Sequence, residues 1–362
     1  MITSKKLITI AAITLSSSAM AAENYEPART ASGKPDLQGF WTNASLTTMQ
    51  RSSNYAELGL TISLEQLGEL TANHHQNVRQ ATDDNQVQGE LPSGKDLGQG
   101  RGYNAFWVDP GSAFGYVKGE YRTSWITYPE SGRIPYSEEG SRLRQENRAK
   151  FSGNDGPEGR ALGERCIIGF GSTGGPPMNN VLYNNMYQIV QTEDYVMILV
   201  EMAHDARIIP IDKNHRPDAL KPWLGDSIAH WDGDVLVIET RNLHPQQAPS
   251  NIAALSDQGV VIERFSRFSE EQILYEFEVR DPIFYSEAWG AKWPSMQQAL
   301  SPTSMPVMKV TMGCRAYYPV RVDRKWTSAN FLVILKGVMW PLFCCALEGL
   351  CFITLPRISS SP

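Results

Sequence analysis

Three pairs of short apolar runs, each pair separated by a polar turn, lie between residues 187 and 280 and restrict the fold more than any other feature of the chain. The first pair is 187–191 with 195–203, and the third is 260–268 with 273–280. Alternation at a period of two predicts strands that each bury one face, and strands joined by short turns form antiparallel hairpins. Because no helix separates the hairpins, we predict a mostly β fold, an antiparallel barrel or barrel-like sandwich with an irregular, partly helical N-terminal wrap.

The middle pair is joined by Asp-Gly at 232–233, a dipeptide that strongly favours a two-residue type I′ turn. A turn centred there would place His230 opposite Val235 and on the same face of the sheet as Asp226 and Glu239. A carboxylate beside an imidazole orients the ring and stabilises its cation. His230 is therefore a candidate general base, with a solvated histidine at the end of a hairpin as the alternative.

The N-terminus has the three-part pattern of a secretory signal peptide. The basic pair Lys5-Lys6 precedes an apolar stretch at 7–15, and the small residues Ala19 and Ala21 form a cleavage site. The apolar stretch is too short to span a bilayer. We predict cleavage after Ala21 and a periplasmic or secreted protein.

The last part of the chain differs in composition from everything before it. Residues 304–362 contain two acidic residues, against 37 in the preceding chain, and four of the five cysteines. Back-translating residues 304–319 and reading the result one base out of register permits a polar C-terminus, which indicates a frame error near residue 300. We therefore predict the following division: 1–21 signal peptide, 22–150 irregular N-terminal wrap with short helices, 151–300 antiparallel β domain, 301–362 out-of-frame tail.

The tail affects two further expectations. Cys166 is the only cysteine before it, and the shifted frame can supply a partner, so we weigh a disulfide to the lost C-terminus against a buried, inert thiol. The apolar segment 331–355 contains Lys336, Pro341 and Glu348. Charges at the centre of a span are costly, so we expect no stable membrane span, with a C-terminal anchor as the alternative.

The net charge argues against one class of partner. From Ala22 to Thr303 the chain has 24 Lys and Arg against 37 Asp and Glu, a net charge of −13. A surface this negative repels phosphate backbones, so we expect no binding to nucleic acid.

Several short blocks together resemble a large family of exported bacterial proteins of unassigned function. The resemblance covers about residues 33–298 and is carried by 35–41 (PDLQGFW), 164–166 (ERC), 195–207 (YVMILVEMAHDAR), 223–227 (WLGDS), 230–234 (HWDGD) and 263–267 (ERFSR). It implies an exported protein whose C-terminus contains Cys-His-Glu-Gly-Asn-Tyr, a segment that the shifted frame permits here. It implies no particular activity.

A group of ionisable residues follows directly after the apolar run at 195–200. Glu201, Asp205 and Arg207 would share one face of an unbroken strand, and His204 would point to the other face. The four side chains can share a site only if a bulge or turn intervenes. In such a site a neighbouring carboxylate would suit His204 for acid–base chemistry.

The sequence thus nominates catalytic and substrate-binding candidates. The candidate catalytic residues are Glu201, His204, Asp205 and His230, and the candidate substrate-binding residues are Arg133, Tyr136, Arg207 and Trp231. No His-Glu-x-x-His or Cys-x-x-Cys spacing supports a metal site, and the sequence indicates no cofactor. No Gly-x-Ser-x-Gly motif supports a nucleophilic serine.

Two functions remain open from the sequence. The first is an exported enzyme that uses acid–base chemistry on a small organic molecule or sugar chain, as a lyase, isomerase or hydrolase. The alternative is a non-catalytic envelope protein that binds an apolar or aromatic ligand in a β-barrel. Ionisable groups that converge at a pocket favour the enzyme, and an interior cavity lined by apolar groups favours the binding protein.

Overall fold

The computed structural model describes residues 25–78, 110–150, 156–169, 173–247 and 252–298. Contacts within the chain divide it into residues 1–304 and 305–362, and all described residues belong to the first unit. The predicted signal peptide at 1–21, the tail at 301–362 and its apolar segment lie outside the described residues. Over the ranges described, the structure has no helix that is both long and apolar enough to span a bilayer.

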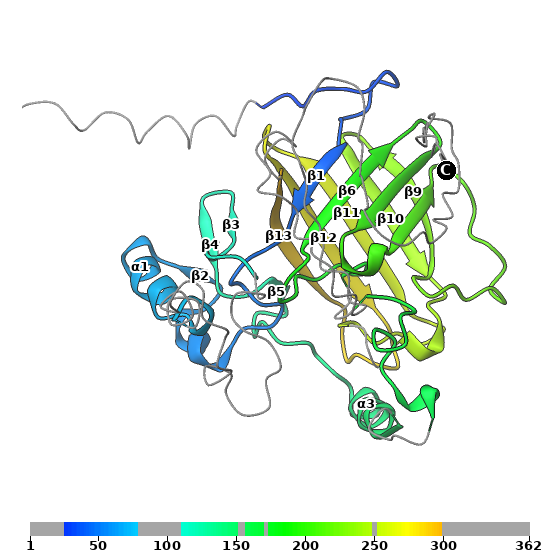
Figure 1. The fold of residues 1–362 in the computed structure, drawn as a ribbon, viewed down its shortest axis with the longest axis horizontal. Coiled ribbons are helices and arrows are strands. Elements are labelled where there is room, and N and C mark those ends of the chain that lie inside the picture. The colour runs from blue at the N-terminus through cyan, green and yellow to red at the C-terminus, as the bar shows by residue number, and fades with distance from the viewer. Residues whose placement is uncertain (1–24, 79–109, 151–155, 170–172, 248–251, 299–362) are drawn as a thin grey trace, which may run out of the picture. The chain divides into compact units, whose positions relative to one another are not determined.

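One ten-stranded antiparallel sheet contains most of the strands (Figure 1). Its path is β8 (Ala206–Pro210), β7 (Tyr195–Val200), β6 (Met186–Gln191), β1 (Gly39–Thr42), β13 (Trp289–Gln298), β12 (Gln272–Arg280), β11 (Val260–Arg267), β10 (Val235–Arg241) and β9 (Asp226–Asp232), with β5 (Ile126–Tyr128) paired to β13.

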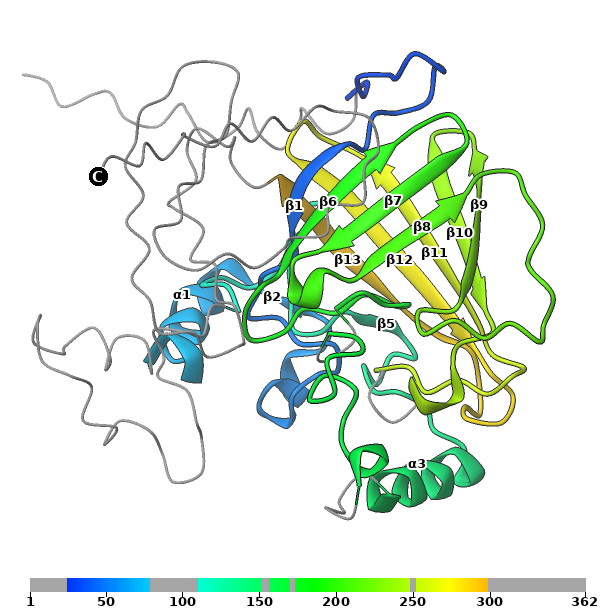
Figure 2. The ribbon, with the colours of Figure 1, turned by 45° about the vertical axis from the view of Figure 1, so that its right-hand side comes forward.

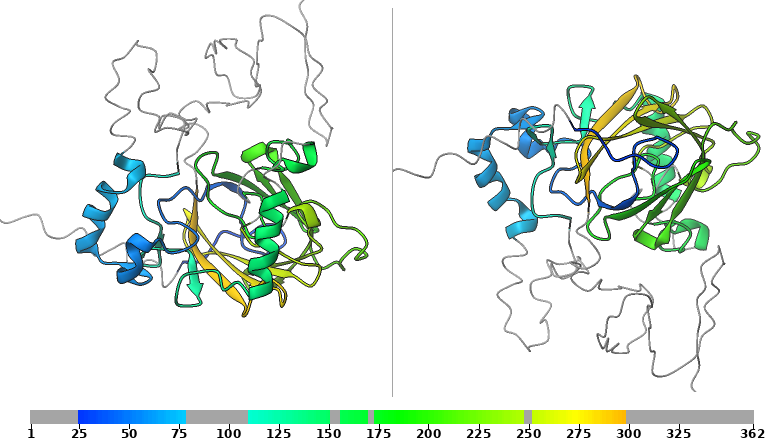
Figure 3. Two further views of the ribbon diagram at one scale, coloured as in Figure 1. Left: turned by 90° about the horizontal axis from the view of Figure 1, so that it is seen from below. Right: turned by 90° about the horizontal axis from the view of Figure 1, so that it is seen from above.

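The sheet curls, as the views along it show (Figure 3), so that its two edge strands β8 and β9 come together (Figure 2). Among the described residues a single parallel bridge joins them, between Ile211, which directly follows β8, and Ala229 of β9. The fold is therefore barrel-like and mostly β, as predicted, but the barrel is not closed by a continuous ladder.

Short elements make up much of residues 25–150, but β1 and β5 from this range pair within the main sheet, so the sheet is not confined to the predicted β domain at 151–300. A small sheet contains β2 (Thr61–Ile62), β4 (Glu120–Arg122) and β3 (Tyr116–Val117). The α-helices within the described residues are α1 (Leu64–Ala72) and α3 (Glu138–Lys150). Helix α1 begins at a capping box in which Ser63 and Gln66 satisfy each other's backbone amides.

The first and third predicted hairpins are confirmed as β6–β7 and β11–β12. The predicted register of the middle hairpin is wrong by two residues, because the turn is centred on Gly233 and Asp234 and His230 pairs with Val237. Gly233 takes the left-handed φ of +58° at the first central position, where a type II′ turn requires glycine. Arg29 binds both carboxylate oxygens of Asp234 in this turn, at 2.9 and 2.8 Å.

Aromatic side chains fill the space enclosed by the curled sheet. Its largest fully buried side chains include Trp41, Tyr187, Phe265, Tyr275, Phe277 and Trp289. Phe277 packs its ring edge-on against Trp289, with 5.6 Å between ring centroids. A ligand in this interior would have to displace side chains packed at core density.

Cys166 is exposed rather than buried. The structure therefore argues against an inert core thiol. The cysteine that a shifted frame would supply lies outside the described residues, so the disulfide stays a prediction.

His74 provides a pH-dependent contribution to stability. It is 6% exposed, and its ring lies edge-on to Phe114 with 5.8 Å between centroids. Burial, helped by the charge that His75 carries when protonated, lowers the pKa of His74 to about 4. The pKa in the unfolded chain is about 6.5, so the unfolded state binds more protons between pH 6.5 and pH 4.

We expect this contribution to be complete above pH 6.5 and to disappear as the pH falls to 4, a loss of about 1–3 kcal/mol. Urea unfolding across this range should show a shallower pH dependence for His74→Gln than for the natural chain. Equal slopes for the two proteins would contradict a buried, neutral His74.

Candidate functional site

A pocket lies where the two edge strands of the sheet separate. Asp212 N–H donates to the Ala229 carbonyl at 2.8 Å beside the single β8–β9 bridge. Nearer the start of β8 the strands are separated by a pocket of about 420 Å³, a size common for small-molecule sites. We call it the seam pocket; its polar lining is His204, Asp205, Arg207, Arg216 and Ser227, and its apolar lining includes Ile167, Ile168, Pro222, Trp223 and Leu224.

A tight turn brings His204 and Asp205 into this pocket. Strand β7 ends at Val200, three residues earlier than the sequence predicts. Ala203 and His204 then take left-handed φ values of +57° and +58°, which reverses the chain before β8. His204 and Asp205 therefore both line the pocket, although neighbours on a strand would face opposite ways.

Glu201 does not join them. Its Oε2 accepts a hydrogen bond from the Met186 amide at 3.3 Å, and Glu201 is not among the residues that line the seam pocket. The hypothesis of one cavity shared by Glu201 and His204 is therefore wrong in this structure. Glu201 precedes the reversed part of the turn and remains beside β6.

Asp205 is held by a backbone amide. Its Oδ2 accepts a hydrogen bond from Gly169 N–H at 2.6 Å. A Cβ atom on Gly169 would lie 3.0 Å from this oxygen and 2.8 Å from Met202 Cγ, so the close approach favours glycine. Burial raises the pKa of Asp205 above its ordinary value, although the Gly169 hydrogen bond and the charge of His204 oppose the rise.

Arg207 belongs to a buried ion pair behind the pocket. It is 3% exposed and Glu263 is 0% exposed. Arg207 Nη1 donates to Glu263 Oε1 at 2.9 Å, and Nη2 donates to Oε2. Nη2 also lies 3.3 Å from Ser227 Oγ and from Thr240 Oγ1. Burial alone would lower the pKa of Arg207, but the attraction of Glu263 outweighs it and raises this pKa.

Tyr275 completes this buried cluster. Its hydroxyl donates to Glu263 Oε1 at 2.7 Å and accepts from the Met178 amide at 3.0 Å. Burial and the Glu263 charge raise the pKa of Tyr275 well above its ordinary value, so the hydroxyl keeps its proton as a donor.

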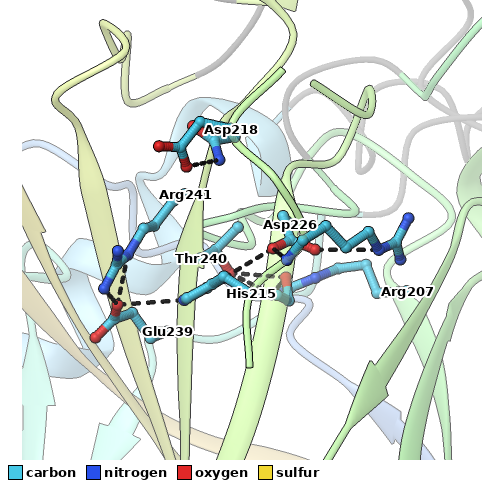
Figure 4. A network of polar contacts seen from close by, with 10 residues as sticks. Arg207, His215, Asp218, Asp226, Glu239, Thr240 and Arg241 are labelled. Carbon is cyan, nitrogen blue, oxygen red and sulfur yellow. Dashed lines mark hydrogen bonds and ion pairs between the residues drawn. The ribbon is translucent and has the colours of Figure 1, made fainter. Parts of the chain in front are cut away.

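A second polar cluster lies on the outer face of β9 and β10, and Figure 4 shows its contacts. His215 Nδ1 lies 2.8 Å from Asp226 Oδ2, and its Nε2 lies 3.3 Å from Glu239 Oε1. The backbone amide of Arg216 donates to the same Asp226 oxygen at 2.8 Å. Burial alone would raise the pKa of Glu239, but hydrogen bonds from Arg241 and His215 outweigh it and lower this pKa.

The histidine between these carboxylates is therefore His215 and not the predicted His230. His230 shares their face of the sheet but is exposed opposite Val237. The β8–β9 loop folds over this face and inserts His215 between Asp226 and Glu239. The pairing of Asp226 with His230 that the sequence suggested is wrong, because strand parity sets only the face, and the loop that precedes β9 supplied the partner.

The remaining predicted substrate-binding residues lie apart from the seam pocket. Arg133 is exposed. The ring of Tyr136 packs 5.5 Å from that of Tyr285, and Arg144 lies 4.1 Å above it. Trp231 is half-buried with the Lys34 ammonium 5.7 Å from its ring. Of the eight site candidates, the structure gathers His204, Asp205 and Arg207 around one pocket.

Sequence reasoning did not nominate several residues of the two polar clusters and the pocket wall, among them Trp223, Tyr275, His215 and Glu263. Trp223 lines the pocket and stacks on His244 with 3.9 Å between centroids. Tyr275 and His215 gave no signal beyond their residue type. Glu263 did give one, because it interrupts the alternating buried face formed by its neighbours in β11.

The described ranges contain no group of three or more His, Cys, Asp or Glu residues that could hold a metal ion. Comparisons of the chain with protein-family models, curated proteins and solved structures give no match.

Proposed function

We propose that this protein is an exported enzyme that transfers protons on a small organic molecule bound in the seam pocket. Asp205 is the acid–base group, and His204 is the second ionisable group beside it. The reaction class remains that of a lyase, isomerase or hydrolase, in which a positioned carboxylate accepts or returns a proton.

The observation that most supports this proposal is the position of the Asp205 carboxylate. It lines a pocket with apolar walls, and the Gly169 amide orients it. Partial burial raises its pKa above the ordinary value of an aspartate, which is the direction expected of a carboxyl group that takes part in proton transfer.

Two features support catalysis over ligand storage in the barrel. The interior is filled by core side chains such as Trp41 and Tyr275. The ionisable residues His204, Asp205 and Arg216 instead converge on the pocket at the seam. The stacked Trp223–His244 pair favours a second candidate, non-catalytic binding of an aromatic molecule in the same pocket.

A panel of 4-nitrophenyl esters, 4-nitrophenyl glycosides and enolisable ketones tests the proposal. We expect turnover of at least one class by the natural chain, and a loss of at least about a hundredfold in kcat for Asp205→Asn. The asparagine keeps an oxygen for the Gly169 amide, so folding should be preserved. Asp257→Asn, at an exposed position outside the pocket, is the matched control.

Turnover that is equal in Asp205→Asn and Asp257→Asn would remove Asp205 from the mechanism. Binding of an aromatic panel member without any turnover would favour the non-catalytic candidate.

A further inference from the structure

We propose that the edge of β8 that faces the seam pocket, which pairs with no strand at Ala206 and Ile208 in the part of the chain that the structure describes, binds a short, extended peptide as an added strand. This inference deepens the proposed function by naming the ligand class, and it rests on that function only for the location of the pocket. Peptide binding is measured separately from proton transfer, so either proposal can fail alone.

The hydrogen-bonding direction of β8 follows from the two ends of its ladder with β7. Val200 N–H donates to the Asp205 carbonyl at 2.8 Å, and Ile211 N–H donates to the Asp194 carbonyl at 2.7 Å. In an antiparallel pair, hydrogen-bonded and non-hydrogen-bonded residues alternate. The odd-numbered residues of β8 therefore bond to β7, and the peptide groups of Ala206 and Ile208 point away from β7.

Two neighbouring residues agree with this assignment. Pro210, like Ala206 and Ile208, is an even-numbered residue of β8, so its backbone nitrogen points away from β7. A proline is tolerated there because its missing N–H would face an open edge. Asp212 has this parity as well, and its N–H crosses to the Ala229 carbonyl of β9. The same side of β8 at Ala206 and Ile208 faces the seam pocket, which both residues line.

The spacing of these groups matches a peptide backbone. Alternate residues of a strand repeat every 6.6 Å or so, both in β8 and in an extended ligand. Strand β8 ends the path of the sheet and presents the N–H and C=O groups of Ala206 and Ile208 at this repeat. A ligand of about three or four residues spans both sets of groups.

The seam also sets the direction of the added strand. Strands β8 and β9 run parallel where they bridge, whereas all strand pairs described in the main sheet are antiparallel. A peptide antiparallel to β8 would also be antiparallel to β9, so it would continue the pattern of the sheet. Its alternate side chains would meet the apolar walls formed by Ile168 and Leu224.

Ile208→Pro tests the edge directly. It removes the N–H that points into the pocket but leaves the ladder to β7 intact, and the Ile208 side chain is 63% exposed, so folding should survive. We expect binding of capped tetrapeptides, measured by isothermal titration calorimetry, to weaken at least about tenfold through loss of the donor and the clash of the proline ring. Ile208→Ala keeps the N–H and loses only side-chain atoms, so it should weaken binding much less than Ile208→Pro does.

Tetrapeptides N-methylated at every second amide provide the complementary test. Methylation of the alternate amides that point toward β8 should weaken binding at least about tenfold, and methylation of the other alternate set should not. Three results would overturn the proposal. They are an absence of binding across the tetrapeptide library, equal affinities for Ile208→Pro and Ile208→Ala, and slow hydrogen exchange of the Ile208 amide in the peptide-free protein. The last result would mean that a segment of the chain itself already pairs with this edge.

Discussion

Replacing Glu263 with glutamine is expected to lower the free energy of unfolding by about 3–5 kcal/mol. Glu263 is fully buried and binds Arg207 through both carboxylate oxygens. Glutamine nearly preserves the shape and still accepts from Tyr275, but it leaves the Arg207 charge without its counter-charge in the core. Urea unfolding at neutral pH, with circular dichroism as the signal, measures the loss.

A double replacement separates the cost of an unpaired charge from the worth of the pair. Arg207→Met combined with Glu263→Leu removes both charges and keeps the volume apolar, so we expect it to be markedly more stable than Glu263→Gln. If the single variant unfolds at the same urea concentration as the natural chain, the pair is not buried as the structure describes.

Replacing Trp41 with alanine is expected to cost about 3–5 kcal/mol. Trp41 is 0% exposed, lies opposite Tyr187 on neighbouring strands, and donates its indole N–H to the Leu37 carbonyl at 3.0 Å. Alanine would leave a cavity at the centre of the curled sheet, and the Leu37 carbonyl would lose its donor.

Trp41→Phe is the graded control, because it keeps most of the ring volume and loses mainly the hydrogen bond. Its loss of unfolding free energy should be well below that of Trp41→Ala. A small loss of unfolding free energy in Trp41→Ala would contradict a filled interior. It would then favour the alternative function, in which a ligand binds inside the barrel.

The sequence predicted which segments form hairpins, because alternating apolar residues and turn residues are properties of short stretches of chain. The alternation from Ile273 to Val279 assigns one face of β12 to the core, and those positions are buried. The turn between β9 and β10 shows where local signals are insufficient. Gly233 is compatible with a turn centred on 232–233, as predicted, and with a turn centred on 233–234. The structure has the turn at 233–234, where Arg29 contacts Asp234.

The candidate site could be predicted only in part. The sequence placed His204 and Asp205 in one ionisable group, and a turn with left-handed residues at Ala203 and His204 does bring both to the pocket. The sequence could not exclude Glu201, because the point at which the chain reverses decides which side chains enter. That point depends on contacts with β6 and with Gly169, far away in the chain.

The sequence by itself determined the β class, the antiparallel hairpins and the buried faces of the strands, because each follows from the period and composition of a short segment. Only the tertiary structure decided the partners of the charged residues. Arg207, Glu263 and Tyr275 come from three strands, and His215 reaches Asp226 from a loop, so no local spacing encodes these contacts. The seam pocket likewise exists because the curled sheet leaves β8 and β9 incompletely paired, a consequence of how all its strands pack together.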